Sequence, residues 1–127
     1  MSCQNCDGKK LLKIMRGTYG REIYITVKGL DWDFTNPPSG YTYSFAVEVI
    51  KPDETSVSLT ATAVNENTVK FTLDAKDSSD DFYDTGLYGL KVRCTKQDST
   101  PTTVEQHTIE VDTCIYIYNE VNCAPPC

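Results

Sequence analysis

Apolar and polar residues alternate at every second position through several segments of the chain. This period of two is typical of half-buried β-strands, because successive side chains of a strand point to opposite faces of the sheet. The clearest alternating segments are residues 23–27, 43–49, 57–63 and 69–73. Apolar residues do not recur at the 3.6-residue period of an amphipathic helix, so the pattern predicts an all-β fold without helices of any length.

Turn-forming residues separate the predicted strands. Clusters of Asn, Pro, Asp, Ser and Gly occur at residues 36–40, 51–54 and 98–101, where the chain is expected to reverse. The short polar segment 65–67 predicts a tight hairpin between two strands. Residues 109–117 keep one alternation over a length too great for one sandwich strand, so we expect this segment to bend or overhang the domain.

The segment 84–90 predicts a corner between strands. Asp84 and Gly86 turn the chain, and Tyr88 enters the next strand with a hydroxyl that can bond backbone just upstream. Such a tyrosine corner is a feature of immunoglobulin-like sandwiches. We therefore expect an immunoglobulin-like antiparallel β-sandwich of about seven or eight strands over residues 11–118, with Cys-bearing tails at 1–10 and 119–127.

Length and composition agree with one globular domain. The chain has 127 residues, 39% hydrophobic and 24% charged, which is enough to bury a core without a metal or a disulfide. No segment approaches the length of a membrane span, and we expect no membrane partner. The first six residues are polar rather than signal-like, so we expect the chain to stay in a cytoplasm, with its thiols initially reduced.

Charge is distributed unevenly. The net charge is −6, which argues against general nucleic-acid binding, because phosphate neutralisation needs a basic face. Residues 1–28 hold six basic and two acidic side chains, net +4, and the remainder holds six and sixteen, net −10. Two interpretations stay open: a solvated basic strand pair, or a basic N-terminal arm that docks on an acidic partner. The arm contains Lys9, Lys10, Lys13 and Arg16.

Aromatic residues suggest two further surfaces. Tyr116 and Tyr118 lie on the alternation opposite Ile115 and Ile117, so we expect them to face outward as partner contacts, unless a loop or the N-terminal tail covers them. Trp32 is expected to plug the open end of the sandwich, and the alternative is a carbohydrate platform.

Residue types for catalysis are sparse, and we expect no enzyme. The only histidine, His107, is expected to be a surface residue of a strand. The aspartates of residues 74–84 lie in a polar loop, which does not supply the raised carboxyl pKa that acid catalysis needs and lacks the ligand order of a helix-loop-helix calcium site. Phosphate-binding and dinucleotide-binding glycine motifs are absent.

Cysteines give the sharpest chemical alternative. Cys3 and Cys6 have the spacing of a zinc knuckle, and Cys123 and Cys127 would complete a tetrahedral site. Disulfides formed after release from the cell, or free tails, are the other possibilities. Cys94 shares the alternation of Tyr88 and is expected in the core, whereas Cys114 is expected on the side opposite Ile115. We expect neither to be an activated nucleophile, since we expect no neighbouring histidine that would lower the pKa of its thiol.

Residues 21–111 also resemble a known family. The resemblance lies in the strand 22–27, an Asp-rich segment with Trp32 and Phe34, the strands 45–49 and 69–73, and the segment 85–92. Together these resemble the small immunoglobulin-like domain of virion proteins of tailed bacteriophages, such as the N-terminal domain of baseplate upper proteins. The chain departs from that pattern because it has no long C-terminal fibre or coiled coil and adds cysteine-bearing tails.

The resemblance implies a non-enzymatic structural protein of a phage virion. Its departures favour a small stand-alone accessory or decoration protein on the capsid or at a head or tail junction. A baseplate or fibre adaptor and a carbohydrate-binding or adhesin module are the alternatives. The implied partners are other virion proteins, with many copies of the chain per particle assembled in the host cytoplasm.

Overall fold

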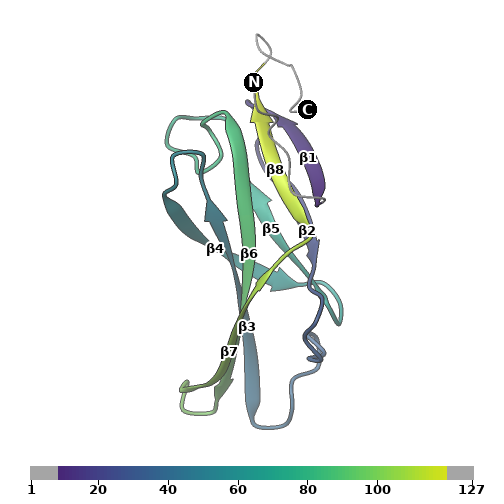
Figure 1. Cartoon of the computed structure of the whole chain (residues 1–127). Helices are drawn as coiled ribbons and strands as arrows, with labels where there is room; N and C mark the ends of the chain where they lie inside the picture. The colour runs from purple at the N-terminus through teal and green to yellow at the C-terminus, as the bar shows by residue number, and fades with distance from the viewer. Residues whose placement is uncertain (1–8, 120–127) are drawn as a thin grey trace.

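The computed structural model describes residues 9–119, and every regular element in that range is a β-strand (Figure 1). The all-β prediction is thus confirmed for these residues. β1 begins at Lys10, the last residue of the predicted N-terminal tail. The eight strands are β1 (Lys10–Met15), β2 (Arg21–Thr26), β3 (Tyr41–Ile50), β4 (Ser56–Ala63), β5 (Thr68–Leu73), β6 (Gly86–Asp98), β7 (Thr103–Glu110) and β8 (Thr113–Tyr118).

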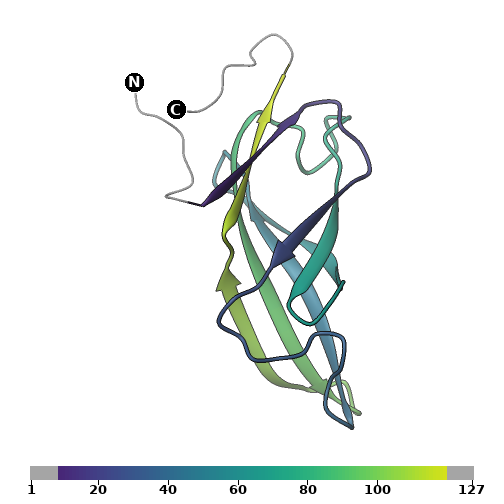
Figure 2. The same cartoon turned by 90° about the vertical axis from the view of Figure 1, so that its right-hand side faces the viewer.

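The strands form one curled, hydrogen-bonded path. Its order is β1-β8-β6-β3-β4-β5-β2, and β7 pairs with β6 beside this path. The two terminal strands of the path, β1 and β2, lie on the same side of the molecule in both views (Figures 1 and 2). The curl therefore leaves two sheet edges near each other.

Strand β1 departs from the predicted antiparallel arrangement. It runs parallel to β8, with Leu12 opposite Ile115, while every other strand pair is antiparallel. The prediction of a wholly antiparallel fold is wrong for this pair. Alternation of side chains has the same period in both kinds of sheet, so it carries no information about strand direction. The first and last strands of the described residues are therefore neighbours in the sheet.

The alternating positions fill one core. Ile23 and Ile25 of β2 are buried, whereas the residues next to them in the strand, Glu22, Tyr24 and Thr26, are exposed. Buried and less buried positions alternate in the same way in β3, β5 and β6. The largest fully buried side chains lie in strands, apart from Phe82 of the 74–84 loop: Tyr88, Phe82, Ile14, Ile25, Leu73, Ile115, Ile117, Val47, Val49, Val69, Val92 and Cys94.

Two predicted connections are confirmed. The segment 65–67 joins β4 to β5, with Ala63 opposite Val69 and the Val64 amide donating to the Thr68 carbonyl at 2.8 Å. Residues 109–117 do not form one strand, because the chain leaves β7 after Glu110 and enters β8 at Thr113. β7 pairs with the C-terminal half of β6, and β8 pairs with the N-terminal end of β6. The strands before and after the bend therefore pair with two parts of the same strand.

The tyrosine corner is present as predicted. The Tyr88 hydroxyl donates to the Asp84 carbonyl oxygen at 2.5 Å, and the Tyr88 side chain is fully buried. Burial, and next the charge of Asp84, raise the pKa of Tyr88. Gly86 has a φ of +134°, and a Cβ there would lie 2.9 Å from Pro52, so the turn needs glycine.

The corner gives a stability prediction. Tyr88→Phe keeps the ring that packs 5.0 Å from Phe82 but removes the donor to the Asp84 carbonyl. We expect it to lower the free energy of unfolding by about 1 kcal/mol, the usual cost of one lost hydrogen bond at a partly buried group. Urea unfolding measures this difference. Tyr24→Phe, at an exposed ring, is the control, and equal midpoints for the two variants would contradict the role of the corner.

Candidate functional sites

The basic N-terminal segment is a strand of the sheet. Residues 10–15 pair with β8, and β1 does not pair with β2, so the structure forms neither a free arm there nor a basic strand pair. Lys10 and Lys13 are exposed on β1, and Lys13 lies opposite Tyr116. Lys9 is half-buried, with its ammonium 4.0 Å from the Glu110 carboxylate. Pairing with β8 fixes the positions of Lys10 and Lys13, and Lys9 directly precedes the strand.

Arg16 is bound within the protein. Its Nε donates to the Tyr83 carbonyl at 2.8 Å, and its guanidinium lies 4.3 Å from the centre of the Tyr83 ring. These contacts direct the side chain toward the 74–84 loop and away from the lysines of β1. Tyr116 and Tyr118 are half-buried on β8. The predicted contact residues therefore do not form one surface.

A basic groove lies between the edges of β1 and β2. It has a volume of about 570 Å³. Lys28 forms an ion pair of 3.1 Å with Asp112 at one wall. The sequence placed Lys28 in the basic part of the chain but gave no sign that Tyr24 would lie beside it. The residues that line this basic groove are Lys9, Lys10, Tyr24, Thr26, Lys28, Asp112 and Thr113.

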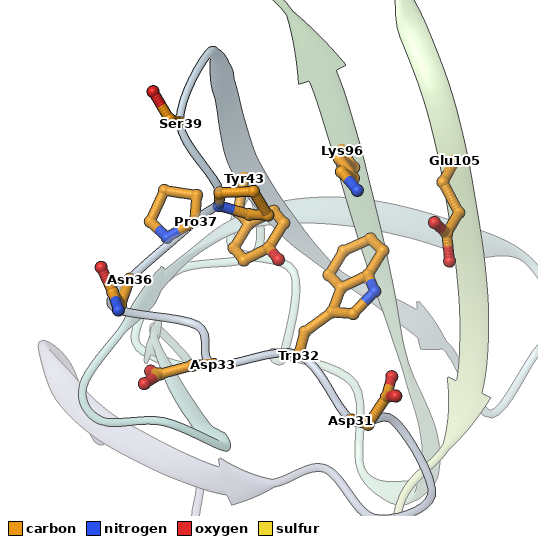
Figure 3. A pocket seen from close by; sticks show the side chains of 10 residues that line it. Asp31, Trp32, Asp33, Asn36, Pro37, Ser39, Tyr43, Lys96 and Glu105 are labelled. Atoms are coloured by element: carbon orange, nitrogen blue, oxygen red, sulfur yellow. The ribbon is translucent and has the colours of Figure 1, made fainter.

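A second groove lies at the end of the domain where Trp32 is found (Figure 3). The Trp32 ring stacks on Tyr43 with centroids 4.5 Å apart and planes 5° apart, and it meets His107 edge to face at 5.5 Å. Trp32 is half-buried against the core, which is the arrangement expected of a plug. The end groove has a volume of about 750 Å³ and is lined by Asp31, Trp32, Asp33, Asn36, Pro37, Pro38, Ser39, Tyr43, Lys96 and Glu105.

Acidic groups dominate the electrostatics of the end groove. His107 Nε2 lies 2.5 Å from Glu105 Oε2, and this hydrogen bond is the largest cause that lowers the pKa of Glu105. Burial is the next cause in size and opposes this effect, and the charges of His107 and Lys96 and the Trp32 indole make smaller contributions that lower the pKa of Glu105 further. Burial, and then the charges of Glu105 and the nearby aspartates, raise the pKa of Tyr43.

The histidine has a cysteine neighbour that the sequence did not reveal. His107 of β7 lies directly opposite Cys94 of β6, so the expectation that no histidine neighbours this cysteine is wrong. The two residues are thirteen positions apart and meet only through strand register. Burial nevertheless raises the pKa of the Cys94 thiol to about 11, so the group is a neutral thiol at neutral pH. Cys94 is a core residue, as predicted.

Cys114 is both buried and disulfide-bonded. Cys94 is free, so these two do not bond to each other. Ile115 is buried as well, which means that β8 is covered on both faces at this point. The proposed zinc ligands Cys3, Cys6, Cys123 and Cys127 lie outside the described residues. Within residues 9–119, no group of three or more His, Cys, Asp or Glu side chains is placed to hold a metal ion.

Comparison with known proteins does not assign the chain. No protein-family model matches it, and no curated protein matches it significantly. In the part of the chain that the structure describes, no helix is long and apolar enough to cross a membrane.

The pair of Glu105 and His107 gives a pH prediction. His107→Ala removes the hydrogen bond that most lowers the pKa of Glu105, so this pKa should rise toward its ordinary value of 4.5. In the wild type, the contact stabilises the fold above that ordinary pKa and loses its effect as the pH falls through the lowered pKa. Carboxyl NMR titration measures the change. Glu22, whose pKa is lowered chiefly by its hydrogen bond with Lys70, is the internal control and should not move.

A Glu105 pKa that is equal in the wild type and in His107→Ala would contradict this assignment. The same shift in Glu22 and Glu105 would also contradict it, because it would report a general change in charge rather than the loss of one hydrogen bond.

Proposed function

We propose that the protein is a non-enzymatic, immunoglobulin-like accessory subunit of a larger assembly, and that the assembly is the virion of a tailed bacteriophage. The strand pairing supports the immunoglobulin-like part. β2 pairs with β5, β3 with β6, and the tyrosine corner precedes β6, as expected in that class of sandwich. The phage part follows from the resemblance of residues 21–111 to virion domains.

The open edge of β1 is the observation that carries the proposal. The backbone amides of Lys10 and Arg16 point toward β8 and donate to the carbonyl oxygens of Asp112 and Tyr118. In a parallel pair, the backbone N–H and C=O groups of successive residues point alternately toward the partner strand and away from it. The backbone groups of Leu11 and Lys13 therefore point away from β8. Among the described residues no strand pairs with that edge. An unpaired edge of this kind is a ready site for addition to another protein.

The chemistry of the cysteines agrees with a particle that leaves the cell. Disulfides persist in oxidising surroundings, which include virion surfaces. The disulfide at Cys114 therefore supports a working environment outside the reducing cytoplasm. It favours the interpretation in which bonds form after release, for this one cysteine.

The end groove supports the enzyme and carbohydrate alternatives less than the β1 edge supports a structural role. Nucleophilic catalysis by Cys94 with His107 as the base would need a thiolate, and burial of the thiol opposes its formation. A carbohydrate platform needs an open aromatic face, whereas Trp32 has Tyr43 stacked on one face and His107 at edge-to-face distance. Both alternatives use groups that already serve packing.

Particle banding tests the function. Lysates of infected cells that produce the chain are separated on a caesium chloride gradient, and mass spectrometry quantifies the chain against the major shell protein. We expect the chain to band with the particles at a fixed ratio. Lys13→Glu, on the open edge, should lower that ratio several-fold through charge reversal, whereas Lys76→Glu, exposed on the 74–84 loop, should not.

A chain that remains with soluble host proteins at the top of the gradient would refute the proposed role. Equal ratios for Lys13→Glu, Lys76→Glu and the wild type would refute the β1 edge as the contact.

A further inference from the structure

The geometry points to a binding site for an extended acidic peptide segment in the basic groove between β1 and β2. This inference rests on the proposed function and specifies the chemistry of the partner: a strand-forming segment rich in Asp or Glu, supplied by another protein of the assembly. Three features support it: the sheet edges next to the groove, the lysines that line the groove and the size of the groove.

Two unpaired backbone edges border the groove. Directly after β2, the Val27 amide points toward β5 and donates to the Asn67 carbonyl. Backbone direction alternates along a strand, so the backbone groups of Ile23 and Ile25 also point toward β5. The backbone of Tyr24 and Thr26 then points away from β5, and these two residues line the groove. On β1, the backbone groups of Leu11 and Lys13 are the ones that point away from β8. Leu11 and Lys13 do not line the groove, to which β1 contributes Lys10, but they follow Lys10 on the same strand. An added strand therefore finds free backbone groups of β2 inside the groove and free backbone groups of β1 directly beyond it.

Charge selects an acidic occupant. The lining holds three lysines and one aspartate, on a protein whose net charge is −6. Lys28 is paired with Asp112 and Lys9 lies 4.0 Å from Glu110, but Lys10 has no ion pair within residues 9–119. An acidic segment would pair with Lys10 and compete for the other two. The excess of lysines over acidic residues in this lining contrasts with the negative net charge of the chain and favours the approach of negative partners.

The same charges disfavour a second copy of this chain at the edge. Pairing of two β1 strands side by side would bring the exposed Lys10 and Lys13 of one copy against those of the other. Like charges across adjacent strands are destabilising, and lysines on an edge are a known device against self-association. The occupant we infer is therefore a segment of a different protein.

The dimensions fit a short strand. β1 has six residues, which at about 3.3 Å per residue gives an edge of about 20 Å. The groove volume of about 570 Å³ is within the range of specific binding pockets. Tyr24, which is 52% exposed, offers one apolar contact to a side chain of the added segment. A segment of five to seven residues, alternating acidic and apolar, would satisfy all three features.

A peptide titration on the full chain tests the inference. The probe is a fluorescein-labelled peptide of seven residues that alternates glutamate with valine, and anisotropy reports binding at low ionic strength. We expect saturable binding that weakens at high ionic strength. A lysine-valine peptide of equal length should not bind, and methylation of alternate backbone amides in the glutamate peptide should weaken binding, because added strands use main-chain hydrogen bonds.

Matched variants locate the site. Lys10→Gln with Lys28→Gln should weaken binding of the glutamate peptide by about five- to tenfold, as expected for the loss of two exposed charge contacts. The control is Lys51→Gln with Lys76→Gln, which removes the same charge elsewhere. Lys51 matches Lys28 because it also forms an ion pair, with its ammonium 3.7 Å from the Asp81 carboxylate. Lys76 matches Lys10 because it is also exposed. The control should bind as the wild type does.

Three results would overturn the inference: no binding of the glutamate peptide, equal binding of the lysine peptide, or equal losses in the two double variants. Particle banding separates it from the proposed function. If Lys10→Gln with Lys28→Gln loses the peptide but still bands with particles at the wild-type ratio, the acidic partner segment is refuted and the virion role stands. If the wild type binds the peptide but does not band with particles, the groove stands and the virion role fails.

Discussion

The burial of one face of β6 is the constraint on which the rest of the structure depends. This strand has thirteen residues and pairs with β3 along one edge and with β7 and β8 along the other. Tyr88, Leu90, Val92 and Cys94 alternate along its buried face. Because both edges and one face are in use, β6 fixes the register of its neighbours. The Tyr88 hydrogen bond to the Asp84 carbonyl fixes where the strand begins.

The sequence predicts the local structure of this domain better than its pairing. The alternation of apolar and polar residues identifies β2, β3, β4 and β5, because each of these strands has one face toward solvent and one face toward the core. It does not identify β1, where Leu11 and Leu12 are consecutive and both half-buried, so the charges of that segment suggest an arm. The parallel pairing with β8 is equally hidden, since it joins strands about one hundred residues apart.

The same limit applies to the candidate sites. Charge counting located the basic part of the chain and included Lys28, yet only the curl of the sheet brings Lys28 and Tyr24 beside Lys9 and Lys10. His107 and Cys94 become neighbours only through the register of β6 and β7. Arg16 shows the converse, because its charge suggested a partner contact and its position beside Tyr83 gives it an internal one. Sites of this kind are set by long-range pairing that single residues do not encode.

The proposed contact uses the exposed backbone edge of β1, and amide hydrogen exchange of the full chain tests most directly whether that edge is open. If the β1 edge is open, the amides of Leu11 and Lys13 exchange many-fold faster than those of Leu12 and Ile14, which point toward β8. That contrast within one six-residue strand is the predicted result. Equal protection of all four amides would show that the edge is already covered in the isolated protein, and would contradict the central claim.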